Sequence, residues 1–282
     1  MTINIRDRAK LARGLLAGFL LAIALGAGIS GTANASSSRA HQSQGAKPTV
    51  VLVHGGWADS SGWNQEITRL QRLGYAVIAP ANPLRALDSD SAYIRSVLRT
   101  IDGPIVLVGH SYGGAVITNA AVGVPNVKAL VYIAAFAPDA GESLVQLVTK
   151  NPGTEIGPQT LTPRPYPLPG GGEGTDLYLT QAGFETAFAS DVPKSMADQM
   201  WAEQRPFSQE AFESASGEPA WKTIPSWYLV ATQDHAIPPV TQRFMAGRAH
   251  AKTTEVKASH VPMISQPAAT TRLILKAAGA VS

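Results

Sequence analysis

The clearest chemical signal in the sequence is a serine flanked by glycines. Ser111 lies in the segment GHSYGG (109–114), directly after an apolar run that ends at Val108. Where G-x-S-x-G joins a strand to a helix, the serine occupies a sharp turn and the glycines leave room around it. Its hydroxyl can attack a carbonyl carbon once a base takes its proton. We therefore predict Ser111 as a nucleophile, with the backbone N–H of Tyr112 facing the developing oxyanion.

A base and an acid that could activate this serine occur later in the chain. His260 follows the last strand signal, in SHVPM (259–263), where it would reach the carboxyl ends of the strands, and we predict it as the base. The orienting acid should precede the histidine in chain order. Asp234 follows the strand that ends at Val230, and its loop would neighbour that of His260, so it is the preferred acid. Asp139, which follows the previous strand, is the alternative candidate for the acid. If it is not the acid, we expect it to cap a helix or to lie at the hinge of a lid.

A second oxyanion donor is expected in the loop after the first strand, where the sequence reads HGGW (54–57). Gly56 is the preferred donor of that N–H group, and Trp57 is the alternative. His54 is predicted to orient the loop rather than to take part in catalysis. Because Trp57 flanks the loop, it is also a predicted substrate contact.

The elements that must position these residues follow from hydropathy. Apolar, β-branched runs alternate with segments of helical periodicity, which is typical of a mainly parallel sheet with helices on both faces. This predicts an α/β fold with about six strands. The strands are expected at 49–53, 76–79, 105–108, 129–133, 227–230 and 254–256, and the helices at 61–73, about 88–101, 112–122, 239–247 and 267–278.

The alternation breaks between about residues 139 and 222. Residues 151–174 are dense in proline and glycine and cannot form a core helix or strand, and short helical pieces are expected at 177–189, 194–203 and 208–212. An insertion between core strands commonly covers the site, so we predict a cap, with a surface excursion as the alternative. The cap contains large apolar side chains that are expected either to pack against the core or to contact the substrate. They are Phe184, Phe188, Met196, Met200, Trp201 and Phe207.

The N-terminal segment has the layout of a secretory signal peptide. A basic start is followed by an apolar run over 14–29 and by Ala33-Asn34-Ala35, a small-residue cleavage signal. We predict a signal peptide over 1–35, a flexible leader over 36–47 and an exported protein. An uncleaved anchor is the weaker alternative, because a spanning helix needs about 20 apolar residues.

The overall charge is +3, from 23 basic and 20 acidic residues, but the signal segment accounts for it. Without residues 1–35 the chain has 19 of each, so we expect neither a nucleic-acid partner nor, after cleavage, stable membrane insertion. The chain has no cysteine, which excludes disulfides, thiolate catalysis and cysteine-ligated metals. We predict no cofactor and no metal site, and the sequence carries no signal for an oligomeric state.

From about Pro48 to its end, the chain resembles the α/β-hydrolase superfamily. The match is best with compact members, namely bacterial esterase-like hydrolases and the plant methylesterase/hydroxynitrile-lyase group. The resemblance is carried by HGGW (54–57), GHSYGG (109–114), Asp234 with IPP (237–239), and Ser259-His260. It implies an α/β-hydrolase domain over 48–282, a cap over about 139–222, and Ser111, His260 and Asp234 as a catalytic triad.

Two departures from the resembling lyases bear on the reaction. Those lyases carry a lysine after the catalytic histidine and a hydroxylated residue in the first loop, where this chain has Val261 and Gly55. Haloalkane dehalogenases have an aspartate in place of Ser111. We therefore expect a serine carboxylic ester hydrolase that acts on a small-molecule ester. The alternatives are a cofactor-free lyase or oxygenase on the same fold, and a non-catalytic binding protein.

Overall fold

The computed structural model describes residues 47–281. The predicted signal peptide over 1–35, and all of the predicted leader except Lys47, lie outside the described residues. Within the described part of the chain, no helix is both long and apolar enough to cross a membrane.

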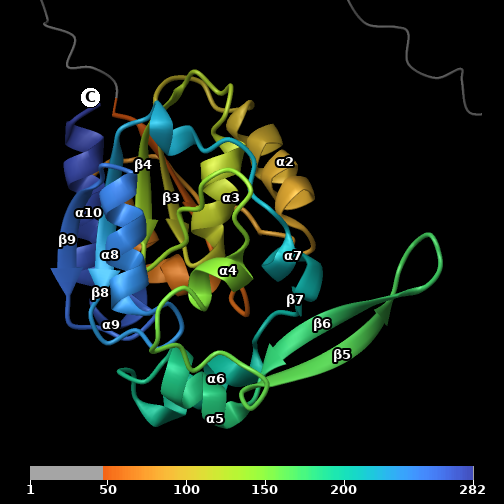
Figure 1. Ribbon diagram of the computed structural model, residues 1–282. Helices are drawn as coiled ribbons and strands as arrows, with labels where there is room; N and C mark the ends of the chain where they lie inside the picture. Colours follow the sequence, from red (N-terminus) through yellow and green to blue (C-terminus); the bar gives the residue numbers. More distant parts are fainter. Residues whose placement is uncertain (1–46, 282) are drawn as a thin grey trace, which may run out of the picture. The chain divides into compact units, whose positions relative to one another are not determined.

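A six-stranded sheet forms the centre of the described chain (Figure 1), and every neighbouring pair of its strands is parallel. The side chains of β3 and β8 are buried along their whole length, as continuous apolar runs predict. The predicted fold class is therefore confirmed. In spatial order the strands are β2 (Val77–Ile78), β1 (Thr49–Val53), β3 (Ile105–His110), β4 (Val127–Ile133), β8 (Ser226–Ala231) and β9 (Lys252–Val256).

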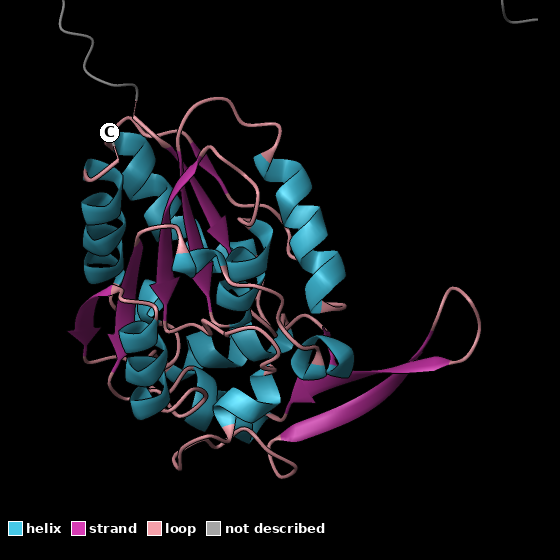
Figure 2. Ribbon diagram, turned by 45° about the horizontal axis from the view of Figure 1, so that its top comes forward, coloured by secondary structure: helices cyan, strands magenta, loops and turns pink. Residues whose placement is uncertain are grey.

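Helices cover both faces of this sheet (Figure 2). The chain steps outward from β1 to β2 and then returns past β1 to β3, so right-handed crossovers place α1 and α2 on opposite faces. The later steps run in one direction, which puts α3 and α8 on the face of α2, while α10 packs beside α1. These helices are α1 (Asn64–Arg72), α2 (Leu87–Leu98), α3 (Tyr112–Ala120), α8 (Pro239–Arg248) and α10 (Pro267–Gly279).

Shorter helices shape the loops that join these elements. The first begins where the side chain of Asp59 accepts a hydrogen bond from the Ser61 N–H. The helix after β4 begins at a capping box, in which Ser143 and Gln146 satisfy each other's backbone N–H groups. They are η1 (Ser60–Trp63), α4 (Leu144–Val148), η3 (Ala220–Lys222) and α9 (Pro262–Ser265).

The segment between β4 and β8 contains a β-hairpin, β5 (Leu161–Pro167) and β6 (Glu173–Leu179), that projects from the body (Figure 1). The sequence predicted no hairpin here, and the predicted helical start at Leu177 is wrong. The prolines of β5 recur at every second residue, so their missing N–H groups all fall on one side of an edge strand, where no ladder bond is lost. Proline excludes this stretch from the core, but it does not exclude an edge strand.

The part that follows the hairpin is mostly helical, and α5 and α6 lie at the carboxyl ends of the core strands (Figure 1). A π-helical turn occupies Phe184–Phe188, inside the stretch for which an ordinary helix was predicted. The elements are α5 (Gln181–Gly183), η2 (Phe184–Phe188), α6 (Lys194–Ala202), β7 (Phe207–Ser208), which pairs with β6, and α7 (Gln209–Glu213).

Candidate active site

The turn between β3 and α3 holds Ser111 in a strained conformation, with φ 52° and ψ −125°. An L-residue rarely adopts a positive φ, and such strain gathers at functional sites. The turn is so tight that a Cβ atom on Gly109 would lie 2.5 Å from the carbonyl oxygen of Gly113. A Cβ atom on Gly113 would lie 2.5 Å from the Val53 carbonyl oxygen of β1. The glycines of the motif are thus required by backbone contacts on both sides of the serine.

The predicted acid and base lie together beneath the surface. Nδ1 of His260 and Oδ2 of Asp234 are 2.7 Å apart, and both side chains are buried. A carboxylate at Nδ1 fixes the tautomer in which Nε2 is free to accept a proton. In the part of the chain that the structure describes, no hydrogen bond joins the Ser111 hydroxyl to His260. Such contacts commonly tighten only when substrate binds.

The carboxylate of Asp234 is held by a network that the sequence did not reveal. Its Oδ1 accepts hydrogen bonds from the backbone N–H groups of Ala236 and Ile237, at 2.7 and 2.9 Å. Its Oδ2 accepts a further bond of 2.7 Å from Nε2 of Gln242, which is fully buried on α8. Gln242 Oε1 in turn accepts the N–H of Ala231 at the end of β8. Nothing in the local sequence marks Gln242, because its partners meet only when α8 folds back onto β8.

The elbow residue His110 connects the nucleophile to the base. Its Nε2 donates a 2.8 Å hydrogen bond to the carbonyl oxygen of His260, and the two rings are 4.8 Å apart. Burial lowers the pKa of His110 well below its usual value, so this imidazole is neutral. His110 therefore fixes the backbone of His260 from the strand that carries Ser111.

The loop after β1 passes directly over Ser111. A Cβ atom on Gly55 would lie 2.6 Å from the Cβ atom of Ser111, so a larger residue cannot stand there. His54 orients this loop: Nε2 accepts the Asn82 N–H at 2.9 Å, and Nδ1 donates to the Gly55 carbonyl oxygen at 3.0 Å. Burial lowers the pKa of His54, which keeps it neutral. The loop thus brings the backbone of Gly56 close to the serine.

The two predicted oxyanion donors come from the loop after β1 and from the start of α3. The Tyr112 N–H is at the first position of α3, where a helix offers no internal acceptor. The Tyr112 hydroxyl instead donates to buried Asp90 at 2.7 Å, an anchor that the sequence did not suggest. Gly56 lies under the ring of Phe207, which is 2.7 Å from where a Cβ atom would stand. Both oxyanion assignments remain predictions.

The predicted substrate contact Trp57 is buried and has a positive φ of 56°. Its Nε1 donates to the carbonyl oxygen of Leu177 on β6, at 2.9 Å. Its ring makes edge contacts with Phe188 and Phe207. Trp57 therefore joins the loop after β1 to the segment between β4 and β8.

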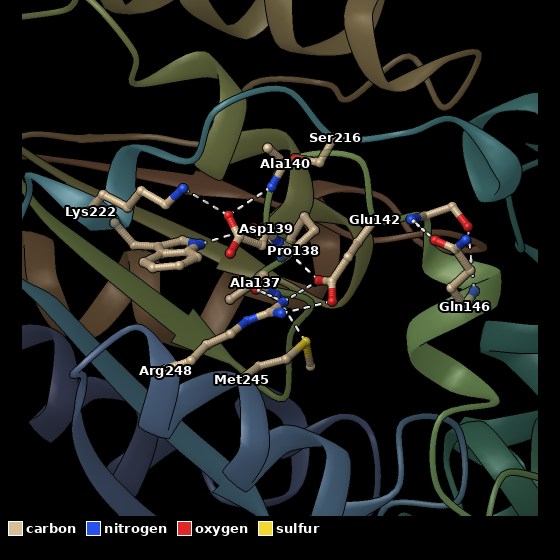
Figure 3. Close-up of polar contacts among 12 residues, drawn as sticks. Ala137, Pro138, Asp139, Ala140, Glu142, Gln146, Ser216, Lys222, Met245 and Arg248 are labelled. Carbon is tan, nitrogen blue, oxygen red and sulfur yellow. Dashed lines mark hydrogen bonds and ion pairs between the residues drawn. The ribbon is translucent and has the colours of Figure 1, made fainter.

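The rival acid, Asp139, lies in a different cluster (Figure 3). Its carboxylate is partly exposed and 3.0 Å from the ammonium group of Lys222, whose hydrogen bond lowers the pKa of Asp139. Beside it, Glu142 pairs with the guanidinium group of Arg248, which ties the loop after β4 to α8. The structure thus brings Asp234, and not Asp139, to His260.

A cavity of about 430 Å³ lies beside the buried site. Phe188 borders both: its ring lines the cavity and lies 5.0 Å from the ring of His260. Of the other apolar residues predicted in the cap, Phe184, Met196 and Met200 line the cavity as well, whereas Phe207 packs against Trp57 and Tyr112. The predicted residue Trp201 instead donates from its indole to the Leu179 carbonyl oxygen.

Across the described residues, no group of three or more histidine, cysteine, aspartate or glutamate side chains could hold a metal ion. The chemistry available at the carboxyl edge of the sheet is that of a serine hydroxyl, an imidazole paired with a carboxylate, and backbone N–H donors.

This arrangement of sheet, elbow and acid–base pair is that of an α/β hydrolase. The chain belongs to the alpha/beta hydrolase family, whose pattern matches residues 50–273. The predicted resemblance is therefore confirmed at the level of the family.

Individual relatives agree with this assignment. The chain is 36% identical over 122 residues to a carbendazim hydrolyzing esterase from Nocardioides sp. (strain SG-4G), a match that covers 39% of this chain and only half the length of that curated relative. It is 27% identical to the alpha/beta hydrolase nvfD of Aspergillus novofumigatus (strain IBT 16806), over 83% of this chain and 97% of the relative. Polyneuridine aldehyde esterase has a similar fold, with a TM-score of 0.71, 21% identity, and coverage of 82% of this chain and 98% of that one.

Proposed function

We propose that this protein is a carboxylic ester hydrolase that acts through Ser111, His260 and Asp234 by an acyl-enzyme mechanism. The observation that carries the proposal is the strained Ser111 at the elbow, next to the buried pair that Asp234 and His260 form at 2.7 Å. Acyl transfer needs a nucleophilic serine and an imidazole base that a carboxylate orients.

In the first half of the reaction, Oγ of Ser111 attacks the ester carbonyl carbon while Nε2 of His260 accepts the hydroxyl proton. The carbonyl oxygen takes on negative charge, which the N–H groups of Gly56 and Tyr112 stabilise. Asp234 stabilises the imidazolium ion that forms. The imidazolium then gives its proton to the leaving oxygen, the C–O bond breaks, and the alcohol departs from the acyl-enzyme.

In the second half, His260 takes a proton from water as that water attacks the acyl carbon. The tetrahedral intermediate collapses, the bond to Oγ of Ser111 breaks, and Ser111 recovers its proton from His260. The products are a carboxylic acid and an alcohol, and no redox step occurs. The name of the Nocardioides relative, a carbendazim hydrolyzing esterase, is compatible with this reaction.

The proposal is tested with p-nitrophenyl esters of acetate to octanoate, comparing the chain from Ser36 onward with its Ser111→Ala variant. We expect the variant to lose a factor of roughly 10³ or more in kcat, because the nucleophile is gone. A fluorophosphonate probe should add its mass at Ser111 in the parent protein, and His260→Ala should slow that labelling. Equal turnover by the parent and the variant would remove Ser111 from the reaction.

Two alternative functions would each give a different result in these assays. Release of cyanide or of an oxygenated product, without ester turnover, would indicate a lyase or an oxygenase on this fold. Tight ligand binding with neither turnover nor phosphonate labelling would indicate a binding protein.

We also propose that the protein is exported and that its N-terminal segment is removed after Ala35. The support is the order of charged, apolar and small residues in that segment. Expression of the full chain in a bacterium, followed by intact-mass analysis of the periplasmic fraction, should give a protein that begins at Ser36. A full-length mass in the membrane fraction would favour an uncleaved anchor.

A further inference from the structure

The cavity of about 430 Å³ lies between two walls that come from different parts of the chain. The core wall consists of the loop after β1, η1 and α9, and the cap wall of η2 and α6. Cavities that bind small molecules commonly measure about 300–1,000 Å³, so this one has room for a substantial organic group.

The cavity adjoins the base rather than the acid. Val261 follows His260 directly and lines the cavity, as does Phe188, whose ring lies against that of His260. In the mechanism proposed above, His260 must protonate the leaving oxygen, so the alcohol part of the ester lies on the histidine side of the carbonyl carbon. The group attached to that oxygen therefore points toward Phe188 and the cavity.

We propose that this cavity binds the alcohol part of the substrate, and that it selects alcohols with a bulky apolar group over small ones. The proposal rests on the ester-hydrolase function above and adds a substrate class to it. The sheltered lining is apolar, with Trp57, Phe184 and Met263 buried. The thioether side chains of Met200 and Met263 can adjust to irregular shapes. An aryl or branched alkyl group gains most from such a surface.

The mouth of the cavity is polar and carries acidic groups. Asp59 and Glu203 line it, and no basic residue does so among the described residues. Partial burial opposes ionisation of Asp59, but the hydrogen bonds from Ser61 outweigh it and lower its pKa. Arg205 is close enough to act on Asp59 electrostatically, so Glu203 is the less compensated charge. We therefore expect anionic alcohols to be disfavoured and cationic ones tolerated.

Thioacetates test the alcohol side alone, because every substrate in the series leaves the same acetyl-enzyme. Thiol release from S-ethyl thioacetate reports a small leaving group, and release from S-(3,3-dimethylbutyl) thioacetate reports a bulky apolar one. Acetylthiocholine is a cationic analogue of nearly the same shape, and S-(2-sulfonatoethyl) thioacetate is an anionic one. We expect kcat/KM for the dimethylbutyl ester to exceed that for the ethyl ester by roughly tenfold or more.

Gly62 offers a clean way to fill the cavity. It lines the cavity, and a Cβ atom there would make only one ordinary contact, 3.6 Å from the Met263 methyl carbon. We expect Gly62→Leu to lower kcat/KM for the dimethylbutyl ester roughly tenfold more than it lowers kcat/KM for the ethyl ester. Met196→Trp, which fills the cavity from the exposed face of α6, should give the same pattern if the leucine variant does not fold.

Two charge variants should shift the cation preference in opposite directions. We define the cation preference as kcat/KM for acetylthiocholine divided by kcat/KM for the dimethylbutyl ester. Glu203→Gln should lower this ratio by roughly threefold at low salt, and Arg205→Gln should raise it by a similar factor. Both shifts should shrink at 0.5 M salt, because the two side chains are exposed.

Each outcome has one meaning. If Gly62→Leu lowers kcat/KM equally for the ethyl and dimethylbutyl esters, or for neither, the cavity does not bind the alcohol. If it instead lowers kcat/KM for p-nitrophenyl octanoate more than kcat/KM for p-nitrophenyl acetate, the cavity binds the acyl chain, and the assignment to the alcohol is wrong. If the parent protein hydrolyses no ester at all, the proposed function fails before the cavity is tested.

Discussion

The carboxyl edge of the sheet and the β5–β6 hairpin are built on opposite principles. At the edge, Gly109 and Gly113 are hemmed in by backbone atoms at 2.5 Å from an added Cβ atom. At the hairpin tip, an added Cβ atom on Gly170 would meet nothing within 4 Å. The backbone conformation at the sheet edge is fixed by many simultaneous contacts, whereas that of the hairpin tip is fixed by its own turn. Strain such as that of Ser111 can persist only in a region of the first kind.

The largest effect should come from Gly113→Ala, compared with Gly170→Ala. The first places a methyl group against the carbonyl oxygens of Val53 and His54, neither of which can rotate away. We expect a loss of about 3 kcal/mol or more in the free energy of unfolding, or failure to fold. The hairpin variant should change the stability by less than about 0.5 kcal/mol. Urea denaturation measures both, and similar losses in the two variants would break the comparison.

A second test asks whether the network around Asp234 holds the acid in place. Gln242→Met keeps the volume but removes the 2.7 Å hydrogen bond to Oδ2 of Asp234. A hydrogen bond to a charged group contributes about 1.5–3 kcal/mol, so we expect kcat to fall by roughly tenfold to a hundredfold, with KM little changed.

Thr241→Val is the matched control for Gln242→Met. Thr241 is also buried on α8, but its hydroxyl bonds to Asn151 and not to the acid. The control should lose stability while kcat remains within about twofold of the parent value. Equal losses of kcat in both variants would mean that Gln242 acts only through the stability of α8.

The core contains a carboxyl group that its surroundings do not satisfy. Glu66 on α1 is fully buried, neither of its side-chain oxygens has a hydrogen-bond partner, and burial raises its pKa from 4.5 to about 8. Between these values the unfolded chain has lost the proton and the folded chain has kept it. This group should therefore lower the free energy of unfolding as pH rises from 4.5 to 8, by roughly 3–5 kcal/mol at about 1.4 kcal/mol per pKa unit.

Glu66→Gln isolates that contribution, because glutamine does not titrate. We expect the stability difference between variant and parent to grow in favour of the variant from pH 5 to pH 8, and then to level off. Denaturation curves at each pH measure the difference, and other titrating groups cancel in it. If the free energies of unfolding of the two proteins changed in parallel with pH, Glu66 would not keep its proton in the folded protein.

The sheet and the elbow were predictable because their signals are local. The elbow is a contiguous motif, and the strands are continuous apolar runs, so Ser111 and β3 could be read together. Asp234 and His260 followed from chain order and from the meeting of strand ends at one edge. Gln242 and Asp90 were not predictable, because each acts on a residue that only the folded chain brings near.

The segment between β4 and β8 was predicted less well, for a different reason. Proline and glycine indicate where a core element is absent, but they do not say what replaces it. Pro163 and Pro165 fit an edge strand because alternate residues share one side, a pattern that looks irregular in the sequence. The π-helical turn at Phe184–Phe188 likewise lies among contacts that only the folded chain makes, such as that of Phe188 with Trp57.

The smallest effect should come from shortening the hairpin. Replacing residues 165–175 with Asn-Gly joins Arg164 to Asp176, which are paired in register, through a two-residue turn that suits a hairpin. It preserves the buried base of β6, where Leu177 accepts a 2.9 Å bond from the Trp57 indole. We expect Tm and kcat/KM for p-nitrophenyl acetate to stay close to the parent values. Trp57→Phe, which removes that bond, should cost about 1 kcal/mol of stability. A large loss in the shortened protein would mean that the tip, like the elbow, is held by contacts beyond its own turn.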